Sequence, residues 1–351
     1  RMFLRAAEFL WQEAHAAYAS AEQAREQTMV GLEVYRDFAE NVAAMPVIAG
    51  EKPENERFPG AVSTFSIEAM MQDGKALQAG TSHFLGTNFA SAQNIRFQNA
   101  NGEFELANTI SWGMSTRMIG GIIMVHGDDD GLRVPPRLAP WQVVIVPMLR
   151  DSEEDAALLD YCEGLKAELV KQSAFGEPVR VLLDTRAAKA ASKRWGWVKK
   201  GAPVVIEVGG RDMAGGNVSM IRRDQLYRED GKLDSAILAK GEFVVQTAEL
   251  LEEIQKVLHT QARAKLDANI VRGVDSFEAL KAHFEGSGKY PGWVEVQWAK
   301  PTGEELDKAV ERIKALKLTF RNVPLDAAPA DGTCMFTGRP AVERILVARA
   351  Y

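Results

Sequence analysis

The sequence has little cysteine and no long apolar run. Two cysteines occur among its 351 residues, Cys162 and Cys334, and they lie far apart in the chain. Two distant thiols give no disulfide framework, which is typical of proteins from a reducing compartment. No apolar run reaches the roughly 20 residues that a membrane-spanning helix requires. The sequence therefore predicts a protein that works without a membrane.

Positive charge is also scarce. The chain carries 42 Lys and Arg against 48 Asp and Glu, which gives a formal net charge of -6. This balance excludes a broadly basic surface that coats nucleic acid, so any RNA contact must be a local patch. With 46% hydrophobic residues, the chain is long enough for two or three domains that each bury a core.

The first part of the chain has the pattern of a sheet with inserted helices. Ser20 and Gln23 form a capping box, and the helix that they open ends before Pro46. Segments 61–70, 94–98 and 104–112 are β-prone and are separated by Gly and Asn. We therefore expect a largely antiparallel sheet.

A second region begins after the proline-rich segment 135–140, which has the composition of a linker. The apolar run Val143–Val146 is typical of a strand buried on both faces. A helix is expected at about 152–172, and strands are expected at 179–183 and 203–208. Strand, helix and strand at these lengths predict a parallel α/β unit.

A long charged helix is expected at about 245–267, and the apolar end 344–351 is expected to be a packed strand. The fold class is therefore predicted as α+β / α/β multidomain. The predicted domains are 1–141, 142–236 and 237–351.

Three short segments have residue types suited to a nucleotide. The first runs from Phe3 to His15 and contains an Arg-x-x-x-Phe step, Arg5 to Phe9. An arginine forks onto phosphate oxygens, and an aromatic ring holds a base by its face. The alternative is a β-strand with an exposed arginine and core aromatics.

The other two segments are Asp73 to His83 and Ser111 to Gly120. In the earlier one, the small residues Ala79, Gly80 and Ser82 would let a ligand approach the backbone. In the later one, Gly113 and Gly120 flank an arginine, Arg117. The alternatives are a core histidine in the first case and a surface arginine after a glycine turn in the second.

These segments, in this order, resemble motif 2, the substrate-lining strand and motif 3 of prolyl-tRNA synthetases of the archaeal/eukaryotic-like type. These enzymes are class II aminoacyl-tRNA synthetases. The resemblance implies an ATP site formed by Arg5, Phe9, Gln78, Thr81, Ser115 and Arg117. Arg5 and Arg117 would be its catalytic cations. It also implies a proline pocket formed by Trp11, Phe58, His83 and Gly113.

The family's reaction joins L-proline to tRNA(Pro) through prolyl-adenylate, using ATP with Mg²⁺. The resemblance implies a class II antiparallel catalytic sheet, an α/β anticodon-binding domain and a small α/β C-terminal domain. It also implies a cytoplasmic homodimer. The last residues, Val347–Tyr351, match the family's ending, in which the final tyrosine leans back toward the catalytic domain.

A basic stretch lies in the predicted anticodon-binding domain. Its 15 residues, 186–200, contain six cations and no acidic residue, and tryptophans are interleaved among them. Phosphate-binding cations beside aromatic rings are suited to single-stranded RNA loops. The candidate tRNA contacts are Arg186, Lys193, Arg194, Trp195 and Lys199. The alternative is a solvated charged face.

Some positions depart from the family pattern. Ala6, Ala14 and Ala16 replace the family's usual residues near the site, so a non-catalytic tRNA-binding or regulatory relative is an alternative. Cys334 stands alone where many relatives have four zinc-binding cysteines, and one thiolate cannot form a tetrahedral site. We therefore expect no structural zinc.

The Arg-x-Glu half of motif 2 would precede Arg1, so the chain is expected to be a fragment that forms prolyl-adenylate poorly. A sister ligase for threonine, glycine or histidine would share the class II core. The Gly80 to His83 string and the Trp11 to Glu13 step favour proline.

Overall fold

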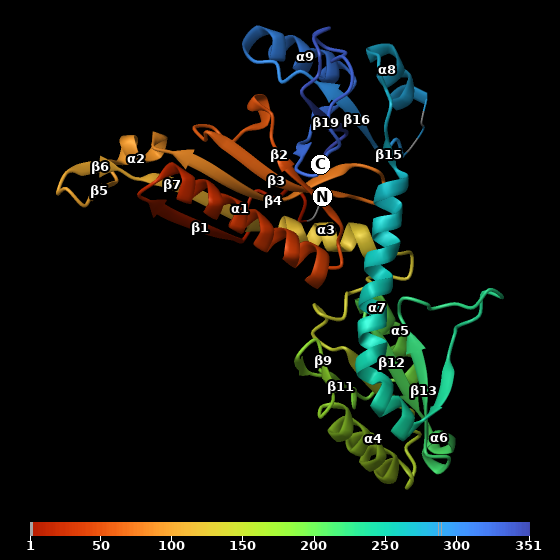
Figure 1. Ribbon diagram of the computed structural model, residues 1–351. Coiled ribbons are helices and arrows are strands. Elements are labelled where there is room, and N and C mark those ends of the chain that lie inside the picture. Colours follow the sequence, from red (N-terminus) through yellow and green to blue (C-terminus); the bar gives the residue numbers. More distant parts are fainter. Residues whose placement is uncertain (1–2, 287, 289) are drawn as a thin grey trace. The chain divides into compact units, whose positions relative to one another are not determined.

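The computed structural model describes residues 3–286, 288 and 290–351, and contacts divide the chain into two compact units (Figure 1). The first unit combines 1–41, 45–125 and 263–351. The second contains 42–44 and 126–262. Most of the predicted third domain therefore packs with the first, and the boundaries at 141 and 236 stay predictions.

The first unit is organised around a six-stranded sheet whose neighbouring strands are all antiparallel, as expected from the sequence. Their order is β1-β7-β4-β3-β2-β18. The bounds are β1 Trp11–Tyr18, β2 Val47–Glu51, β3 Ser63–Met70, β4 Ala76–Gly86, β7 Asn108–Ser115 and β18 Val323–Pro324. The last strand comes from the C-terminal part of the chain, which thus completes one edge of the sheet.

Small elements connect these strands. A π-helical turn, η1 (Phe38–Val42), follows the first helix, and a short 3-10 turn, η2 (Glu54–Glu56), follows β2. After β4 come α2 (Asn88–Gln93) and a hairpin of β5 (Arg96–Gln98) and β6 (Phe104–Leu106). Helix α3 (Arg117–His126) follows β7 directly.

Helix α1 (Ala21–Asp37) covers one face of the sheet, and small residues set how closely it approaches. Its first turn is capped by Ser20, whose Oγ accepts a hydrogen bond from the Gln23 N–H at 3.1 Å, and this is one half of the predicted capping box. A Cβ at Gly31 would lie 2.8 Å from the Trp112 ring. Ser82 Oγ donates to Thr28 O at 2.7 Å, and a Cβ at Gly80 would lie 3.1 Å from the Tyr35 ring.

These contacts give the small residues of β4 a packing role. Gly80 and Ser82 leave room for helix α1, and the expectation that small residues here let a ligand approach the backbone stays a prediction.

The C-terminal part of the first unit has a four-stranded sheet of its own, in the order β15-β16-β19-β17. Its strands are β15 Ile270–Val271, β16 Trp293–Trp298, β17 Thr319–Phe320 and β19 Glu343–Ala348, and its helices are α8 Phe277–Gly286 and α9 Gly303–Ala315. Strand β19 confirms the packed strand predicted at the chain end. Cys334 is fully buried in this core, and the described residues contain no cluster of three or more His, Cys, Asp or Glu side chains arranged to hold a metal ion.

The final residues return to the six-stranded sheet, as the resemblance implied. Ala76 N donates to Arg349 O at 2.8 Å, and Tyr351 N donates to Ala76 O at 3.1 Å. The Tyr351 hydroxyl donates to Asp73, and Lys75 Nζ lies 4.7 Å from the centre of the tyrosine ring. The chain end therefore holds the turn that leads into β4.

The second unit is an α/β sheet in the order β11-β8-β12-β13-β14. Strand β8 lies between β11 and β12, and both are parallel to it, which confirms the predicted unit. The strands are β8 Val143–Pro147, β9 Ser173–Ala174, β10 Glu177–Pro178, β11 Val181–Leu183, β12 Val204–Val208, β13 Asn217–Arg222 and β14 Ala236–Ala239. The helices are α4 Asp155–Leu169, α5 Ala190–Lys200, α6 Gly210–Ala214 and α7 Lys240–Ala268.

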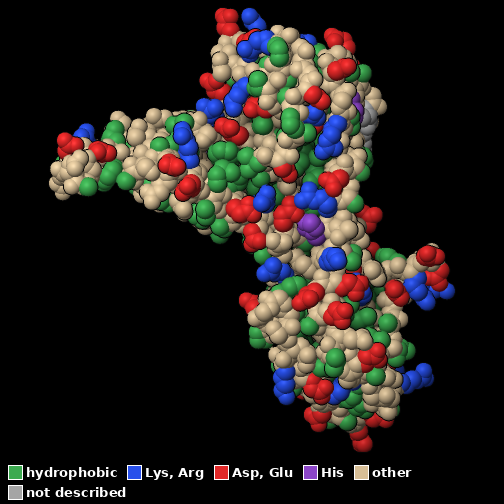
Figure 2. Space-filling model, in the orientation of Figure 1, with side chains coloured by type: hydrophobic (Ala, Val, Ile, Leu, Met, Phe, Trp, Pro, Cys, Tyr) green, Lys and Arg blue, Asp and Glu red, His purple; other side chains and the backbone are tan. Residues whose placement is uncertain are grey.

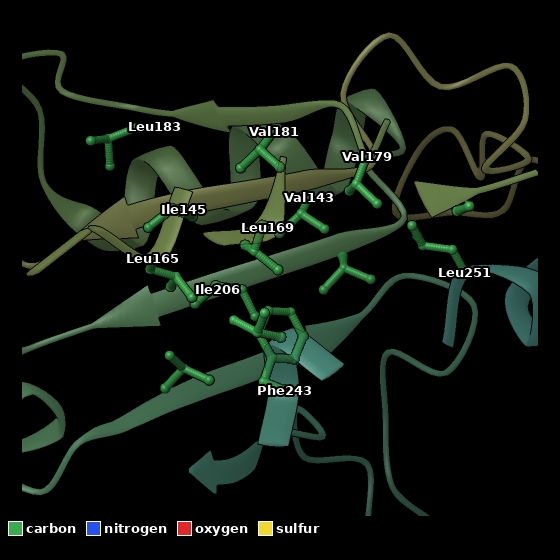
Figure 3. Packing of buried hydrophobic residues seen from close by; sticks show 14 of the residues in the cluster. Val143, Ile145, Leu165, Leu169, Val179, Val181, Leu183, Ile206, Phe243 and Leu251 are labelled. Carbon is green, nitrogen blue, oxygen red and sulfur yellow. The ribbon is translucent and has the colours of Figure 1, made fainter. Parts of the chain in front are cut away.

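The core of the second unit follows from its apolar strands. Val143 and Ile145 of β8 and Ile206 of β12 lie in one cluster with Leu165 of α4 and Phe243 of α7 (Figure 3). The continuous apolar run of β8 is explained by this position, because both faces of the strand are covered. In the residues that the structure describes, no helix is long and apolar enough to cross a membrane.

The close approach of α1 to the sheet predicts that Gly31→Ala destabilises the first unit. The added methyl would overlap the Trp112 ring, and overpacking of this kind costs about 1–3 kcal/mol. Urea unfolding followed by circular dichroism measures the loss. Gly164→Ala in α4 is the matched control, because a Cβ there meets no described atom within 4 Å. Equal effects of the two substitutions would contradict the packing argument.

Candidate functional site

A cavity of about 500 Å³ lies on the six-stranded sheet, on the face opposite to the one where Gly80 and Ser82 contact α1. Strands β1, β3, β4 and β7, the segment 56–59 and the start of α3 contribute to its walls. Nine of the predicted ATP and proline residues line it: Phe9, Trp11, Phe58, Gln78, Thr81, His83, Gly113, Ser115 and Arg117. Residues that are more than a hundred positions apart in sequence thus meet in one hollow.

A β-bulge brings the residues of β4 to the same face. Ile67 pairs with Gly80 but Glu68 pairs with Gln78, so Ala79 is an extra residue in β4. In a regular strand Gln78 would point away from Thr81 and His83, because side chains alternate with a period of two. The extra residue shifts this alternation, and all three side chains line the cavity.

Arg117 is placed where a helix begins. It is the first residue of α3, directly after the strand that ends with Ser115, and its N–H donates to Ser115 Oγ at 3.3 Å. The amino end of a helix attracts anions, so the guanidinium and the helix favour negative charge at the same point. Burial lowers the pKa of Arg117, and the nearby charge of Arg5 lowers this pKa further.

Arg5 itself is exposed and is not among the residues that line the cavity. Its charge is nevertheless close enough to alter the pKa of Arg117. The predicted role of Arg5 on a phosphate therefore stays a prediction, with the side chain placed near the cavity and open to solvent.

Aromatic side chains form the wall contributed by the first residues of the chain. Phe9 and Trp11 meet edge to face, with ring centres 6.4 Å apart. Both rings are more than half exposed. Their faces are therefore accessible for stacking against a flat ligand.

The opposite wall contains a hydrogen-bonded histidine. His83 Nδ1 lies 3.0 Å from Thr64 Oγ1, and this hydroxyl also accepts the Phe58 N–H at 3.0 Å. The Phe58 ring centre lies 4.8 Å from that of His83. Because the threonine hydroxyl already accepts one bond, its proton is available for Nδ1, which favours the neutral histidine tautomer with its proton on Nε2.

Sequence reasoning missed several residues of this cavity, including Thr64, Glu13 and Arg57. Thr64 belongs to no recognisable motif, and it reaches the site only because β3 pairs it directly with His83. Glu13 lies inside the first motif segment, and the alternation of β1 from Trp11 would have placed it on the same face.

The predicted tRNA-binding stretch is only partly available in the second unit. Lys193 is buried, and its Nζ donates to Asp184 O at 2.9 Å. This corrects the prediction that Lys193 contacts tRNA, because the ammonium is enclosed and holds the end of β11. Arg194 donates to Glu207 at 2.8 and 3.1 Å, so its charge is already matched.

Asp184 organises the rest of this stretch. It is buried and accepts hydrogen bonds from Arg186 Nε at 2.8 Å and Trp197 Nε1 at 2.7 Å. These bonds to Arg186 and Trp197 lower the pKa of Asp184 further than burial raises it. The cations and the tryptophan of this stretch that stay exposed are Arg186, Lys189, Trp195, Lys199 and Lys200.

Figure 2 shows cationic and acidic side chains interspersed on the visible face, as expected for a chain that has slightly more acidic than basic residues.

Comparison with known proteins decides the family. Residues 142–239 match the family described as HGTP_anticodon, Anticodon binding domain. The whole chain is 73% identical to the proline–tRNA ligase of Sphingomonas elodea and covers 69% of that protein. The chain belongs to the proline–tRNA ligase family. It is also 66% identical to the ligase of Sphingopyxis alaskensis, of which it covers 66%.

Solved structures of this ligase family agree with the fold. The prolyl-tRNA synthetase of Cryptosporidium parvum, complexed with L-proline and AMP, matches the whole chain with a TM-score of 0.87 at 32% identity. The chain covers 71% of that protein. A second structure of the same synthetase, with halofuginone and AMPPNP, matches with a TM-score of 0.89. The class II architecture expected from the sequence is thus confirmed.

The surroundings of His83 predict an unusual titration. Burial lowers the pKa of His83 to about 4, so the ring is neutral at pH 7. Between pH 6.5 and 4 the unfolded chain binds a proton that the folded chain excludes, so stability falls as the pH falls through this range. Imidazole NMR of the five histidines, assigned with His83→Gln, measures the midpoint. A midpoint near 6.5 for the signal lost in the variant would contradict the burial argument.

Proposed function

We propose that the protein attaches L-proline to tRNA(Pro) in an ATP-dependent reaction through prolyl-adenylate. The observation that carries this proposal is the single cavity in which Gln78, Thr81 and Arg117 meet the aromatic wall of Phe58 and His83. The similarity to ligases over the whole chain supports the same reaction.

The nucleotide half of the cavity binds ATP. The proline carboxylate attacks the α-phosphate, the bond to the leaving pyrophosphate breaks, and prolyl-adenylate remains. Arg117 stabilises phosphate charge, Phe9 offers its ring to the adenine, and Mg²⁺ arrives with ATP as the ion of the substrate. The terminal ribose hydroxyl of tRNA then attacks the adenylate carbonyl and releases AMP, so no covalent enzyme intermediate is required.

The other half of the cavity binds proline. Trp11 and Phe58 provide apolar walls for the pyrrolidine ring, and Gly113 lies beside Trp11. His83 is neutral there and so does not repel the cationic amine of proline. A hydrogen-bonding yet uncharged group beside aromatic walls suits a small apolar amino acid.

The second unit binds the anticodon region of tRNA. The family match over 142–239 supports this role, and the exposed cations and tryptophan around α5 supply phosphate and base contacts. We keep Arg194 among the proposed tRNA contacts although it pairs with Glu207, because an RNA phosphate can replace Glu207 as its partner. We further propose that the longer protein is a cytoplasmic homodimer, as the family resemblance implies.

The alternative of a non-catalytic relative finds no support. Relatives that are 73%, 66% and 63% identical over the whole chain are proline–tRNA ligases. The alanines at 6, 14 and 16 are therefore compatible with membership of a ligase family.

Ligand binding tests the two halves of the cavity. Calorimetry is expected to show that the chain binds ATP, proline and a sulfamoyl analogue of prolyl-adenylate. Arg117→Ala should weaken ATP about 10- to 100-fold, since it removes bonds to a charged ligand, and should leave proline within about 3-fold. Phe58→Ala should weaken proline about 10-fold by removing an aromatic wall.

The matched controls are Arg96→Ala and Phe104→Ala, which change exposed residues of the β5–β6 hairpin outside the cavity. Both controls should bind like the unmodified chain. The proposal is wrong if the unmodified chain binds none of the three ligands, or if alanine and threonine bind as tightly as proline.

A charge reversal tests the tRNA surface. Lys199→Glu with Lys200→Glu should weaken tRNA(Pro) binding at least about 10-fold in 0.1 M salt and flatten its salt dependence, because fewer counterions are released. The control is Lys308→Glu with Lys314→Glu on α9. It makes the same change in net charge, but at exposed positions of the first unit. Filter binding over a salt series gives both quantities. Equal losses in the two double variants would show that net charge alone matters.

A further inference from the structure

A buried charge cluster lies beside the cavity without lining it. Its centre is Glu68 on β3, whose side chain is completely buried. Lys52 Nζ lies 2.9 Å from Glu68 Oε1. Arg321 donates to Glu68 Oε2 from Nη2 at 2.6 Å and from Nε at 3.2 Å. Two cations thus enclose one carboxylate.

Arg321 comes from the C-terminal part of the chain. It lies between β17 and β18, immediately before the strand that completes the catalytic sheet. The next residue, Asn322, is fully buried and donates to Ile48 O at 3.0 Å and Ser66 O at 3.3 Å. A Cβ at Gly50 would overlap Val323 O, so this approach is possible only beside a glycine.

The cluster borders the nucleotide half of the cavity through strand pairing. Glu68 pairs with Gln78, and Ser66 pairs with Thr81, in the register of β3 and β4. Directly paired side chains on one face lie about 5 Å apart. Ser66 Oγ also donates to Glu68 Oε1 at 3.0 Å. The carboxylate therefore stands next to the two β4 side chains assigned to ATP, at the bulge that aims them.

The charges of the cluster also reach Arg117. Burial lowers the pKa of Arg117 most, while Glu68 raises it and Arg321 lowers it. Burial alone would raise the pKa of Glu68, but Arg321 and Lys52 lower it to about 2. Glu68 is thus ionised at every working pH, and its charge needs both partners.

We propose that Arg321 is a positioning residue for the nucleotide half of the site, acting through Glu68. The inference rests on the function proposed above. Arg321 holds the ionised carboxylate of Glu68 toward the C-terminal segment. This contact keeps Ser66 and Glu68 of β3 paired with Thr81 and Gln78 of β4. Without Arg321, one buried carboxylate keeps a single cation, repels the ATP phosphates and competes for Arg117.

Calorimetry with Arg321→Gln tests this role, with ATP and proline measured separately. ATP affinity should fall at least about 10-fold, whereas proline affinity should stay within about 3-fold. Adding Glu68→Gln to Arg321→Gln removes the carboxylate, and the buried Lys52, whose pKa burial lowers and Glu68 raises, then gives up its proton. No charge remains in the cluster, so ATP affinity should return to within about 3-fold of the unmodified chain. Arg321→Lys keeps the positive charge but cannot make the two hydrogen bonds of the guanidinium to Glu68, so an intermediate loss of ATP affinity is expected.

The matched control is Arg344→Gln. Arg344 is a partly buried arginine of the same C-terminal region that pairs with Glu295 at 3.2 Å and Asp331 at 2.9 Å. Its loss removes comparable bonds away from β3 and β4, so ATP affinity should not change.

The outcomes separate the two proposals. Parallel losses of ATP and proline in Arg321→Gln, with no recovery in the double variant, would show a merely structural role and overturn the inference. If Arg321→Gln does not fold, the test compares the double variant with Arg321→Lys. The inference is overturned if the double variant loses more ATP affinity than Arg321→Lys does. An unmodified chain that binds neither ligand overturns the proposed function itself.

Discussion

One extra residue in a strand determines the geometry of the cavity. Ala79 has no partner in β3, so the side-chain alternation of β4 changes at this point. Gln78 on one side of the bulge and Thr81 and His83 on the other then share a face. Without the bulge, the strand could offer the cavity either Gln78 or the other pair, because alternation in a strand is strict. The assigned ATP and proline contacts of β4 therefore depend on this irregularity.

The C-terminal part of the chain stabilises both ends of this arrangement. Beside the bulge, Arg321 holds Glu68, and β18 extends the sheet. Before β4 begins, Tyr351 holds Asp73 in the turn that starts the strand. A bulge leaves part of the ladder unpaired, so contacts that fix β3 and the entry to β4 limit slippage between them. Coupling of this kind explains why residues 263–351 belong to the same compact unit as the catalytic sheet.

Much of this structure could be predicted from the sequence, because local patterns dictated it. The cap at Ser20, the buried strand at Val143–Val146 and the packed chain end all follow from periodicity and residue type. The motif segments, through their resemblance to a known family, led to eight of the cavity residues, and the same resemblance added Phe58. The cap and the strands needed only the nearby chain, whereas the cavity residues needed the resemblance.

The predictions that failed needed tertiary information. The packing role of Gly80 and Ser82 was missed, because their small size accommodates Tyr35 and Thr28, which lie about 50 residues away in the sequence. Thr64 was missed because only strand pairing brings it to His83. Lys193 was taken as exposed, since a run of cations is usually solvated, yet its position on α5 directs it toward Asp184. Burial of a single charge depends on its partner, which composition does not reveal.

The charge distribution answers a problem that the composition poses. A chain with net charge -6 must bind ATP and tRNA, both strongly anionic. Long-range attraction from the whole protein cannot supply this, because exposed charges are screened beyond about 8 Å at physiological salt. Arg117, the cation proposed for the phosphates, is instead partly desolvated, because burial lowers its pKa, and charge interactions strengthen where water is excluded. The same desolvation makes each unmatched charge costly, so a carboxylate that is buried beside such a cation must itself be firmly held. Glu68, enclosed by Lys52 and Arg321, meets that requirement beside the cavity.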